Sequence, residues 1–442
     1  METPFSAGQT AALPDSLWAA TTRELPRCTA LSGAHKSDVT VIGAGFMGLA
    51  AALKLAQNGA NVVVIDAAEI AWGASGRNNG LLAPGLKRDP HEVRKILGSA
   101  AAERLLRYAG DAPDVVADLI AEHHIDCDLR RSGWIQAAHS RRAVTLLEQR
   151  VQDWQELGAD TEMVHARDLQ SRLGTDYYFG AAFDPRGGSL NPLAFARGLA
   201  TVAQQAGVNI FEGTPAIDFT RSNDRWTVKT PAGSLQSKTI ICCTNAYNHG
   251  IEKLHGAVIP LRTAQGASAQ LSDEQARRIL PGGEAASDTQ RLLTSFRLTT
   301  DNRLIMGGAS ATAGDEHAGL FSWLHRSAER RFPDLGQIEW EYGWSGYLAL
   351  TNNHLPKIFK ADDNYWSGIG CNGRGIAMAT AIGQSIAGLV CGQAANECAV
   401  SVEAPRRIFG FGLRRPGVVA GVVLNRLVDV AERRISGGSS TT

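Results

Sequence analysis

The chain has 442 residues, 44% hydrophobic and 20% charged, which is typical of a globular enzyme large enough for two domains. Lysine plus arginine and aspartate plus glutamate each number 44, and the resulting zero charge argues against a nucleic-acid partner, because phosphate binding favours a basic surface. The seven cysteines include no CxxC pair and no run of about 18 apolar residues occurs, so we expect neither a disulfide framework, nor a zinc knuckle, nor a membrane span.

In chain order, residues 1–37 carry no apolar leader and are predicted to form an N-terminal arm on the surface of a cytoplasmic protein. The β-branched runs "DVTVIG" and "NVVVID" predict two buried parallel strands, and "FMGLAAALKLAQNG" between them predicts a helix, which completes one βαβ unit. Residues 91–157 are predicted to be mainly helical, and residues 258–350 mainly strands. A terminal helix is predicted around 417–434, docked on the body rather than lying on a membrane surface.

The turn of the βαβ unit, "VIGAGFMG", matches the dinucleotide-binding pattern G-x-G-x-x-G. Gly43 permits the tight turn, Gly45 lets the backbone approach a pyrophosphate, and Gly48 lets the helix pack on the strand. Phosphates are favoured at the helix N-terminus that follows. Asp66 ends the next strand about 20 residues later, where a carboxylate accepts the ribose hydroxyls.

A second loop rich in small residues, "AWGASGRNNGLLAPG" at 71–85, follows Asp66. A nicotinamide-binding domain usually continues with another plain βα unit at this point, whereas this loop can run along a ligand that extends past the pyrophosphate. The sequence therefore favours FAD over NAD.

A late glycine-rich turn, "GIGCNGRGIAMATAIG" at 368–383, leads directly into another helix. Such a turn can hold the flavin end of FAD, because backbone N–H groups and the positive end of a helix dipole then face the edge of the ring. Cys371 lies inside this turn and is interpreted as a packing residue, since the chemistry expected here needs no thiol nucleophile.

These stretches, together with "CTNAY", resemble the FAD-dependent oxidoreductases of the D-amino-acid-oxidase superfamily, and most closely the gamma-glutamylputrescine oxidase-like branch. The resemblance extends from about residue 17 to 390. It implies an α/β Rossmann-like FAD-binding domain interleaved with an α+β substrate domain that carries a large antiparallel sheet. We expect an arm at 1–37, a discontinuous FAD domain at 38–90, 160–255 and 345–400, a substrate domain at 91–159 and 256–344, and a C-terminal helix and tail at 401–442.

The resemblance also implies which residues contact FAD. The expected residues are Gly43, Gly45, Phe46, Met47, Gly48, Asp66, Ala67, Ala74, Ser75, Gly76, Arg77, Asn79, Gly80, Leu81, Ala216, Gly343, Gly370, Gly373, Arg374, Gly375 and Ile376.

The chain departs from the family pattern at three positions. Asp66 stands where the family more often has glutamate. Leu348 replaces a cysteine that bonds the flavin in sarcosine-oxidase relatives, so we expect non-covalent FAD. Ile305 replaces a lysine that helps activate oxygen in the same relatives, so a dehydrogenase with a non-oxygen acceptor is an alternative to an oxidase.

The implied reaction is oxidation of an amine or N-alkyl amino acid to an imine, which hydrolyses, with hydride transfer to flavin N5. Arg297 is a candidate for binding a substrate carboxylate, or a structural ion-pair partner. Trp344 and Tyr347 are candidate pocket walls, or plain core aromatics. A non-catalytic flavoprotein subunit remains a further alternative, and no metal site is expected.

Overall fold

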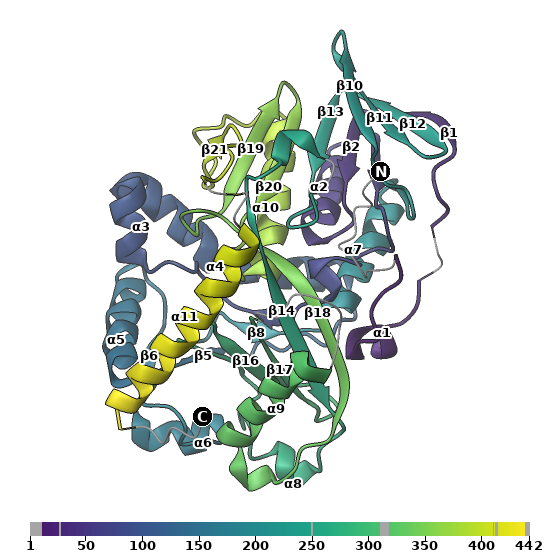
Figure 1. Cartoon of the computed structure of the whole chain (residues 1–442). Helices are drawn as coiled ribbons and strands as arrows, with labels where there is room; N and C mark the ends of the chain where they lie inside the picture. Colours follow the sequence, from purple (N-terminus) through teal and green to yellow (C-terminus); the bar gives the residue numbers. More distant parts are fainter. Residues whose placement is uncertain are drawn as a thin grey trace.

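The computed structural model describes residues 11–25, 28–248, 251–309, 318–409, 411 and 414–437. Two large sheets organise these residues, with the seven-stranded sheet in the upper part of Figure 1 and the eight-stranded sheet in the lower part. This arrangement is the predicted combination of a Rossmann-like domain and a domain with a large antiparallel sheet.

The seven-stranded sheet has the βαβ unit at its centre. Its strands, in spatial order, are β21 (Val402–Glu403), β19 (Lys357–Asp362), β20 (Tyr365–Ile369), β13 (Thr239–Cys242), β2 (Val39–Ile42), β3 (Val62–Ile65) and β9 (Asn209–Phe211). The five strands from β20 to β9 are parallel to their neighbours, and β2, β3, β13 and β20 are buried along their whole length. Burial on both faces explains their continuous β-branched and apolar sequences.

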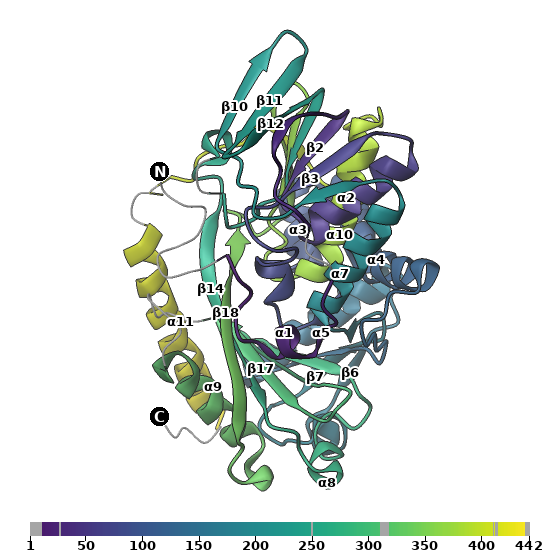
Figure 2. The same ribbon diagram turned by 90° about the vertical axis from the view of Figure 1, so that its right-hand side faces the viewer.

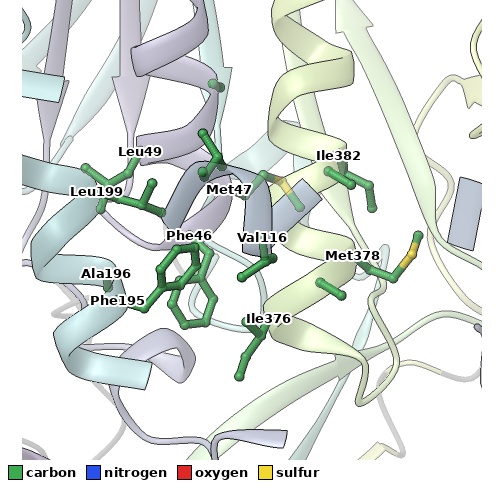
Figure 3. Packing of buried hydrophobic residues seen from close by; sticks show 14 of the residues in the cluster. Phe46, Met47, Leu49, Val116, Phe195, Ala196, Leu199, Ile376, Met378 and Ile382 are labelled. Atoms are coloured by element: carbon green, nitrogen blue, oxygen red, sulfur yellow. The ribbon is translucent and has the colours of Figure 1, made fainter. Parts of the chain in front are cut away.

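Three helices cover one face of this sheet: α2 (Phe46–Gln57), α10 (Gly375–Val390) and α7 (Pro192–Gln205). Helix α4 (Ser99–His123) packs on α10. Helix α10 packs directly on α2. Gly383 makes this close approach possible, because a Cβ at this position would lie 2.3 Å from the carbonyl oxygen of Met47. Figure 3 shows the side chains that fill the space between these helices, with Met47 facing Ile382 and Phe46 against Phe195.

The eight-stranded sheet is antiparallel except where β15 and β5 meet. Its strands, in order, are β18 (Trp340–Leu350), β14 (Ile259–Ser268), β17 (Leu304–Ala309), β16 (Thr294–Leu298), β15 (Ala285–Asp288), β5 (Trp134–Ala137), β7 (Ala181–Asp184) and β6 (Glu162–Val164). Helices α9 (Ala318–Arg331) and α11 (Arg414–Ile435) lie on the outer side of β14 and β18, on the left in Figure 2.

The remaining strands and α-helices lie around these two sheets. They are the four-stranded sheet β1 (Gly33–Lys36), β12 (Gly233–Ser237), β11 (Arg225–Thr230) and β10 (Asp218–Ser222), the pair β4 (Leu81–Leu82) and β8 (Gly188–Ser189), and the helices α1 (Leu17–Thr21), α3 (Pro90–Leu97), α5 (Arg141–Glu156), α6 (Leu169–Leu173) and α8 (Asp273–Ala276). No helix in the described part of the chain combines the length and apolar character needed to cross a membrane.

Part of the N-terminal segment is buried, unlike an arm that lies only on the surface. Leu17 and Trp18 are buried, and the Trp18 indole donates a hydrogen bond to the carbonyl of Asn78. Strand β1 also pairs with β12 in the four-stranded sheet. The sequence does not show this burial, because the partners lie about 60 residues or more away in the chain.

The packing also cuts across the expected domain boundaries. Strands β6 and β7 lie in the eight-stranded sheet although residues 160–255 were expected in the FAD domain. Helix α4 packs on α10, in the core of the seven-stranded sheet, although residues 91–159 were expected in the substrate domain. Residues 438–442 of the expected tail lie outside the described residues.

Candidate functional site

A cavity with a volume of about 790 Å³ opens at one edge of the seven-stranded sheet. Strands β2, β3, β13 and β20 are parallel, so their carboxyl ends meet at this edge. The residues that follow these ends all line the cavity: Gly43, Asp66, Cys243 and Gly370. Ligands of open α/β sheets bind at this location.

The first glycine motif has the geometry that its spacing predicts. Gly43 has φ +106°, and a Cβ there would lie 2.8 Å from the carbonyl oxygen of Cys243. A Cβ at Gly48 would lie 2.0 Å from the carbonyl oxygen of Gly43, so this glycine allows the helix to pack on the turn. Gly45 precedes the first residue of α2 and faces Ser75, whose hydroxyl accepts a hydrogen bond from the Phe46 N–H at 3.0 Å. The first loop and the small-residue loop are thus joined at the N-terminus of α2.

Asp66 sits at the end of β3 and faces the same cavity. Its carboxylate accepts hydrogen bonds from the N–H groups of Ala44 at 2.7 Å and Ala68 at 2.9 Å, one on each oxygen. Burial raises the pKa of Asp66 to about 6, although the two backbone donors act to lower it. Each carboxylate oxygen can accept a second donor, so the group is suited to binding a ribose diol.

The late glycine-rich turn lies between the end of β20 and the start of α10. Gly370 and Gly373 have φ of +81° and +93°, which explains why glycine stands at both positions. A Cβ at Gly375 would meet only the Cys371 sulfur, at 3.9 Å, so the space in front of this residue belongs to the cavity. Burial raises the pKa of the Cys371 thiol, which disfavours the reactive thiolate form.

The structure brings most of the predicted cofactor residues to one cavity. Those that line it are Gly43, Gly45, Phe46, Met47, Asp66, Ala67, Ala74, Ser75, Arg77, Asn79, Leu81, Ala216, Gly370, Gly373, Arg374, Gly375 and Ile376. Gly48, Gly76, Gly80 and Gly343 are not among the lining residues. At each of these four a Cβ would press on neighbouring protein atoms, so they serve close packing behind the wall.

Arg297 lies outside this cavity, so the geometry does not support its predicted role in carboxylate binding. Its guanidinium is buried and donates hydrogen bonds to the carbonyls of Asn79 at 2.9 Å, Leu190 at 2.8 Å and Leu298 at 3.3 Å. Burial lowers the pKa of Arg297 to about 9. These contacts fix the loop that carries Asn79 against the eight-stranded sheet. The alternative prediction of an ion-pair partner also differs from what is seen, because its acceptors are backbone carbonyls.

The two candidate aromatic residues occupy different environments. Trp344 is fully buried, and its indole donates to the carbonyl of Arg77 at 2.9 Å, so it packs behind the wall. Tyr347 lines the cavity, and its ring lies 6.0 Å from the ring of Tyr247 in a T-shaped contact. Tyr247 in turn lies 5.3 Å from Trp72, which also lines the cavity, and the three rings form an aromatic wall.

The remaining walls come from segments that the sequence analysis did not assign to the site. Strand β14 contributes Leu261, Thr263 and Gln265, and the segment 287–293, from the end of β15 onward, contributes several polar side chains. Helix α11 contributes Gly421, Val422 and Asn425. Lys87 and His354 also line the cavity. Lys87 comes two residues after the small-residue loop at 71–85, so extending that loop would have included it; for α11 the sequence gives no local signal.

The polar atoms of this cavity suit a large polar ligand. Within the described residues, twelve buried side-chain polar atoms have no hydrogen-bond partner, and five of these belong to cavity-lining residues: Asn79 Oδ1, Thr244 Oγ1, Ser287 Oγ, His354 Nδ1 and Arg374 Nε. Buried polar groups are nearly always satisfied in folded proteins. Together with the open space at Gly375 and the Asp66 carboxylate, they fit a dinucleotide with polar groups at both ends.

Two of the three departures from the family pattern, Leu348 and Ile305, occupy defined places in the structure. Leu348 lines the cavity, so an unreactive side chain occupies the position expected for a flavin-bonding cysteine. Ile305 is fully buried on β17 and paired with Ala267 of β14. It brings no charge to this part of the sheet.

Comparison with known proteins agrees with the site. Residues 38–389 match the family described as FAD dependent oxidoreductase. The probable oxidoreductase OrdL of Haemophilus influenzae is 30% identical over 407 residues, 90% of both chains, and gamma-glutamylputrescine oxidoreductase of Escherichia coli is 30% identical over 382 residues, 86% of this chain and 89% of the relative. The crystal structure of glycine oxidase from Geobacillus kaustophilus superposes with a TM-score of 0.69 at 21% identity, covering 80% of this chain and 95% of that one. The chain therefore belongs to the family of FAD-dependent oxidoreductases, with FAD as its cofactor.

Proposed function

We propose that this protein oxidises a C–N bond of an amine or an N-alkyl amino acid. The observation that carries the proposal is the continuity of one cavity, which extends from Asp66 at the sheet edge to Tyr347 and Gln265 under the eight-stranded sheet. A cofactor held at the edge and a small molecule under the sheet therefore share a single chamber. Gamma-glutamylputrescine oxidoreductase and glycine oxidase, both similar to this chain, are named for small molecules that contain amino groups.

The chain's own residues supply binding, orientation and exclusion of water. In this proposal Asp66 accepts hydrogen bonds from the ribose hydroxyls, and the first turn of α10 offers backbone N–H groups that have no acceptor within the helix. The wall formed by Trp72, Tyr247 and Tyr347 gives an amine an apolar and cation-tolerant surface. When bound, FAD supplies the two-electron acceptor for oxidation of the amine to an imine, which water hydrolyses. Leu348 leaves that binding non-covalent.

The first test is reduction of the bound flavin by amines. We expect the purified protein to be yellow, to release its flavin on acid precipitation, and to bleach without oxygen when an amine or amino acid from a broad panel is added. A colourless protein that cannot be reconstituted with FAD would contradict the proposal. Flavin that stays oxidised with every compound of the panel would favour a non-catalytic flavoprotein subunit.

Ile305 favours a second candidate, a dehydrogenase that passes electrons to an acceptor other than oxygen. Reduction of oxygen creates negative charge, which a nearby cation stabilises, and Ile305 is an uncharged residue buried in the sheet. We expect the reduced protein to be re-oxidised more slowly by air than by an artificial electron acceptor. Stopped-flow measurement of both rates decides the question, and re-oxidation by air on the timescale of turnover would identify an oxidase.

A further inference from the structure

Helix α11 turns charged residues toward the protein and apolar residues toward solvent. Two of its three buried side chains in the described part of the chain are charged, namely Asp429 and Arg433 beside Val422. Nine large apolar side chains are exposed in the same part of the chain, and five of them belong to this helix: Val423 at 50%, Leu424 at 62%, Leu427 at 63%, Val430 at 41% and Ile435 at 87% exposure. A helix packed on a protein usually has the reverse arrangement.

These five exposed residues lie along one face of the helix, and we call them the outer stripe. Val423, Leu424, Leu427 and Val430 are spaced i, i+1, i+4 and i+7, which places them side by side on an α-helix, and Ile435 continues the face near its end. Figure 2 shows α11 on its left side, beyond the strands β14 and β18. Apolar residues gathered on an exposed surface in this way mark an interaction site.

The inner face of α11 is held to the protein by ion pairs. Arg291 donates to Asp429 at 2.6 Å and to Glu432 at 2.8 Å. His139 Nε2 lies 3.2 Å from the same Glu432 carboxylate. The docking of this helix on the body, which the sequence predicts, therefore uses mainly its polar face. The outer stripe is left for a partner on the other side.

The charge beside the outer stripe is positive. The sequence of α11 contains five arginines and two carboxylates, and Arg291 binds both carboxylates on the inner face. Among the described side chains of this helix, the exposed charges are those of Arg426 and Arg434. On the neighbouring α9, two exposed arginines, Arg326 and Arg330, stand against one exposed carboxylate, Glu329. A partner of negative charge is therefore favoured.

The sign of this charge decides between two occupants of the outer stripe. A second copy of the chain would bring its own arginines against these, with no carboxylate on the outer face of the helix to pair with them, and such like-charge contacts disfavour association. An anionic lipid surface offers phosphates to the arginines and acyl chains to the apolar residues. Amphipathic helices bind at the membrane interface by this combination. A lipid surface also adapts to a single protruding helix without a matching groove.

We propose that the outer stripe of α11 binds an anionic membrane surface, with Arg426 and Arg434 beside it contacting lipid phosphates. The opposite side of this helix contributes Gly421, Val422 and Asn425 to the wall of the main cavity. A helix with its side chains is about 10 Å across, so the bound protein holds its chamber about one helix diameter from the lipid. This inference goes beyond the proposed function, because it does not depend on which compound is oxidised.

Vesicle flotation of the FAD-loaded protein tests the proposal. We expect binding to vesicles of equal parts phosphatidylglycerol and phosphatidylcholine that is about tenfold tighter than binding to phosphatidylcholine alone. Raising the salt from about 0.1 M to about 0.5 M should weaken it, because salt screens the charges. The double variant Leu424→Gln/Leu427→Gln should bind about 10- to 100-fold more weakly, since it loses apolar contact with lipid. Both leucines are more than half exposed, so flavin content and unfolding temperature should not change.

Two further variants separate the apolar contribution from the charge. Ile217→Gln is the matched control, because it removes a 43% exposed apolar side chain just before β10, at the top of Figure 1 and away from α11. It should bind vesicles like the wild type. Arg434→Gln should reduce the preference for anionic vesicles about fivefold, the effect expected for one basic residue near a charged surface.

Three results would overturn the proposal. The first is wild-type protein that floats with neither kind of vesicle, and the second is a double variant that binds as tightly as the wild type. The third is equal wild-type binding to both kinds, which excludes recognition of anionic lipid. If vesicles are not bound but sedimentation velocity shows a dimer that the double variant abolishes, the outer stripe belongs to a second copy of the chain. Flavin reduction by amines in solution tests the proposed function separately, since Leu424 and Leu427 do not line the cavity.

Discussion

Replacement of Gly375 by valine should give a folded protein that holds no FAD. A Cβ at this position would have only the Cys371 sulfur within 4 Å, so the side chain has room in the protein itself. The backbone there is not in the left-handed region, and valine is no worse than glycine in a helix. The added carbons instead project into the cavity at the N-terminus of α10. The substitution should therefore weaken FAD binding rather than lower the stability of the fold.

Flavin content and thermal unfolding together measure this effect. The purified Gly375→Val protein should lack the visible flavin spectrum, and added FAD should no longer raise its unfolding temperature, since a ligand stabilises a protein only in proportion to its occupancy. Gly375→Ala should show an intermediate loss. Gly417→Val is the matched control: Gly417 is also in a helix, is exposed, and has no neighbour within 4 Å of the added Cβ. Wild-type flavin content in Gly375→Val would show that the flavin ring does not approach this turn.

Gly375 is a sharper probe than the glycines of the first motif. A side chain at Gly45 would collide with the Ser75 hydroxyl at 2.7 Å, and one at Gly43 with the carbonyl of Cys243 at 2.8 Å. Substitution at either position disturbs the protein and the cofactor site together, so loss of flavin there would not separate the two causes.

The sequence predicts the cofactor end of this molecule well because the relevant signals are local. A glycine motif, an acidic residue about 20 positions later and a second glycine-rich turn each follow a strand. Parallel pairing of these strands then brings the residues that follow them to one edge of the sheet, as Gly43, Asp66 and Gly370 show. Gly48 likewise allows the close helix packing that its place in the motif predicts.

The substrate end is less predictable, because its walls come from distant segments. Arg297 lies on a strand of the expected sheet, yet its guanidinium binds carbonyls behind the wall, as nothing in its local sequence indicates. Helix α11 reaches the cavity because Arg291 binds Asp429 at 2.6 Å and Glu432 at 2.8 Å, a contact across more than 130 residues. The buried His139 also contacts Glu432, at 3.2 Å. Such pairings depend on the complete fold, so a charged residue's role cannot be read from its strand alone.

Replacement of Arg331 by methionine should greatly lower the free energy of unfolding, because this arginine belongs to a buried ion pair. Arg331 and Asp288 are 2% and 1% exposed, and their side chains form an ion pair of 2.8 Å. Arg331 also donates to the Tyr178 hydroxyl at 2.7 Å. Burial acts to lower the pKa of Arg331, but Tyr178 and Asp288 outweigh it, so the net pKa is raised and the guanidinium stays charged. Removing one member of a buried pair leaves the other unpaired and typically costs about 3–5 kcal/mol.

Urea unfolding of the flavin-free protein measures this cost, and two further variants identify its source. Arg278→Met breaks an exposed pair with Glu274, whose side chains are 52% and 73% exposed, and should change the free energy of unfolding by less than about 1 kcal/mol. Asp288→Asn keeps an oxygen for the N–H groups of Gln290 and Thr294 and removes the charge. Combined with Arg331→Met, it should therefore recover part of the lost stability. If the double variant were as unstable as the sum of the two single variants, the unpaired Asp288 charge would not be the cause, and loss of the Arg331 packing and hydrogen bonds would explain the effect instead.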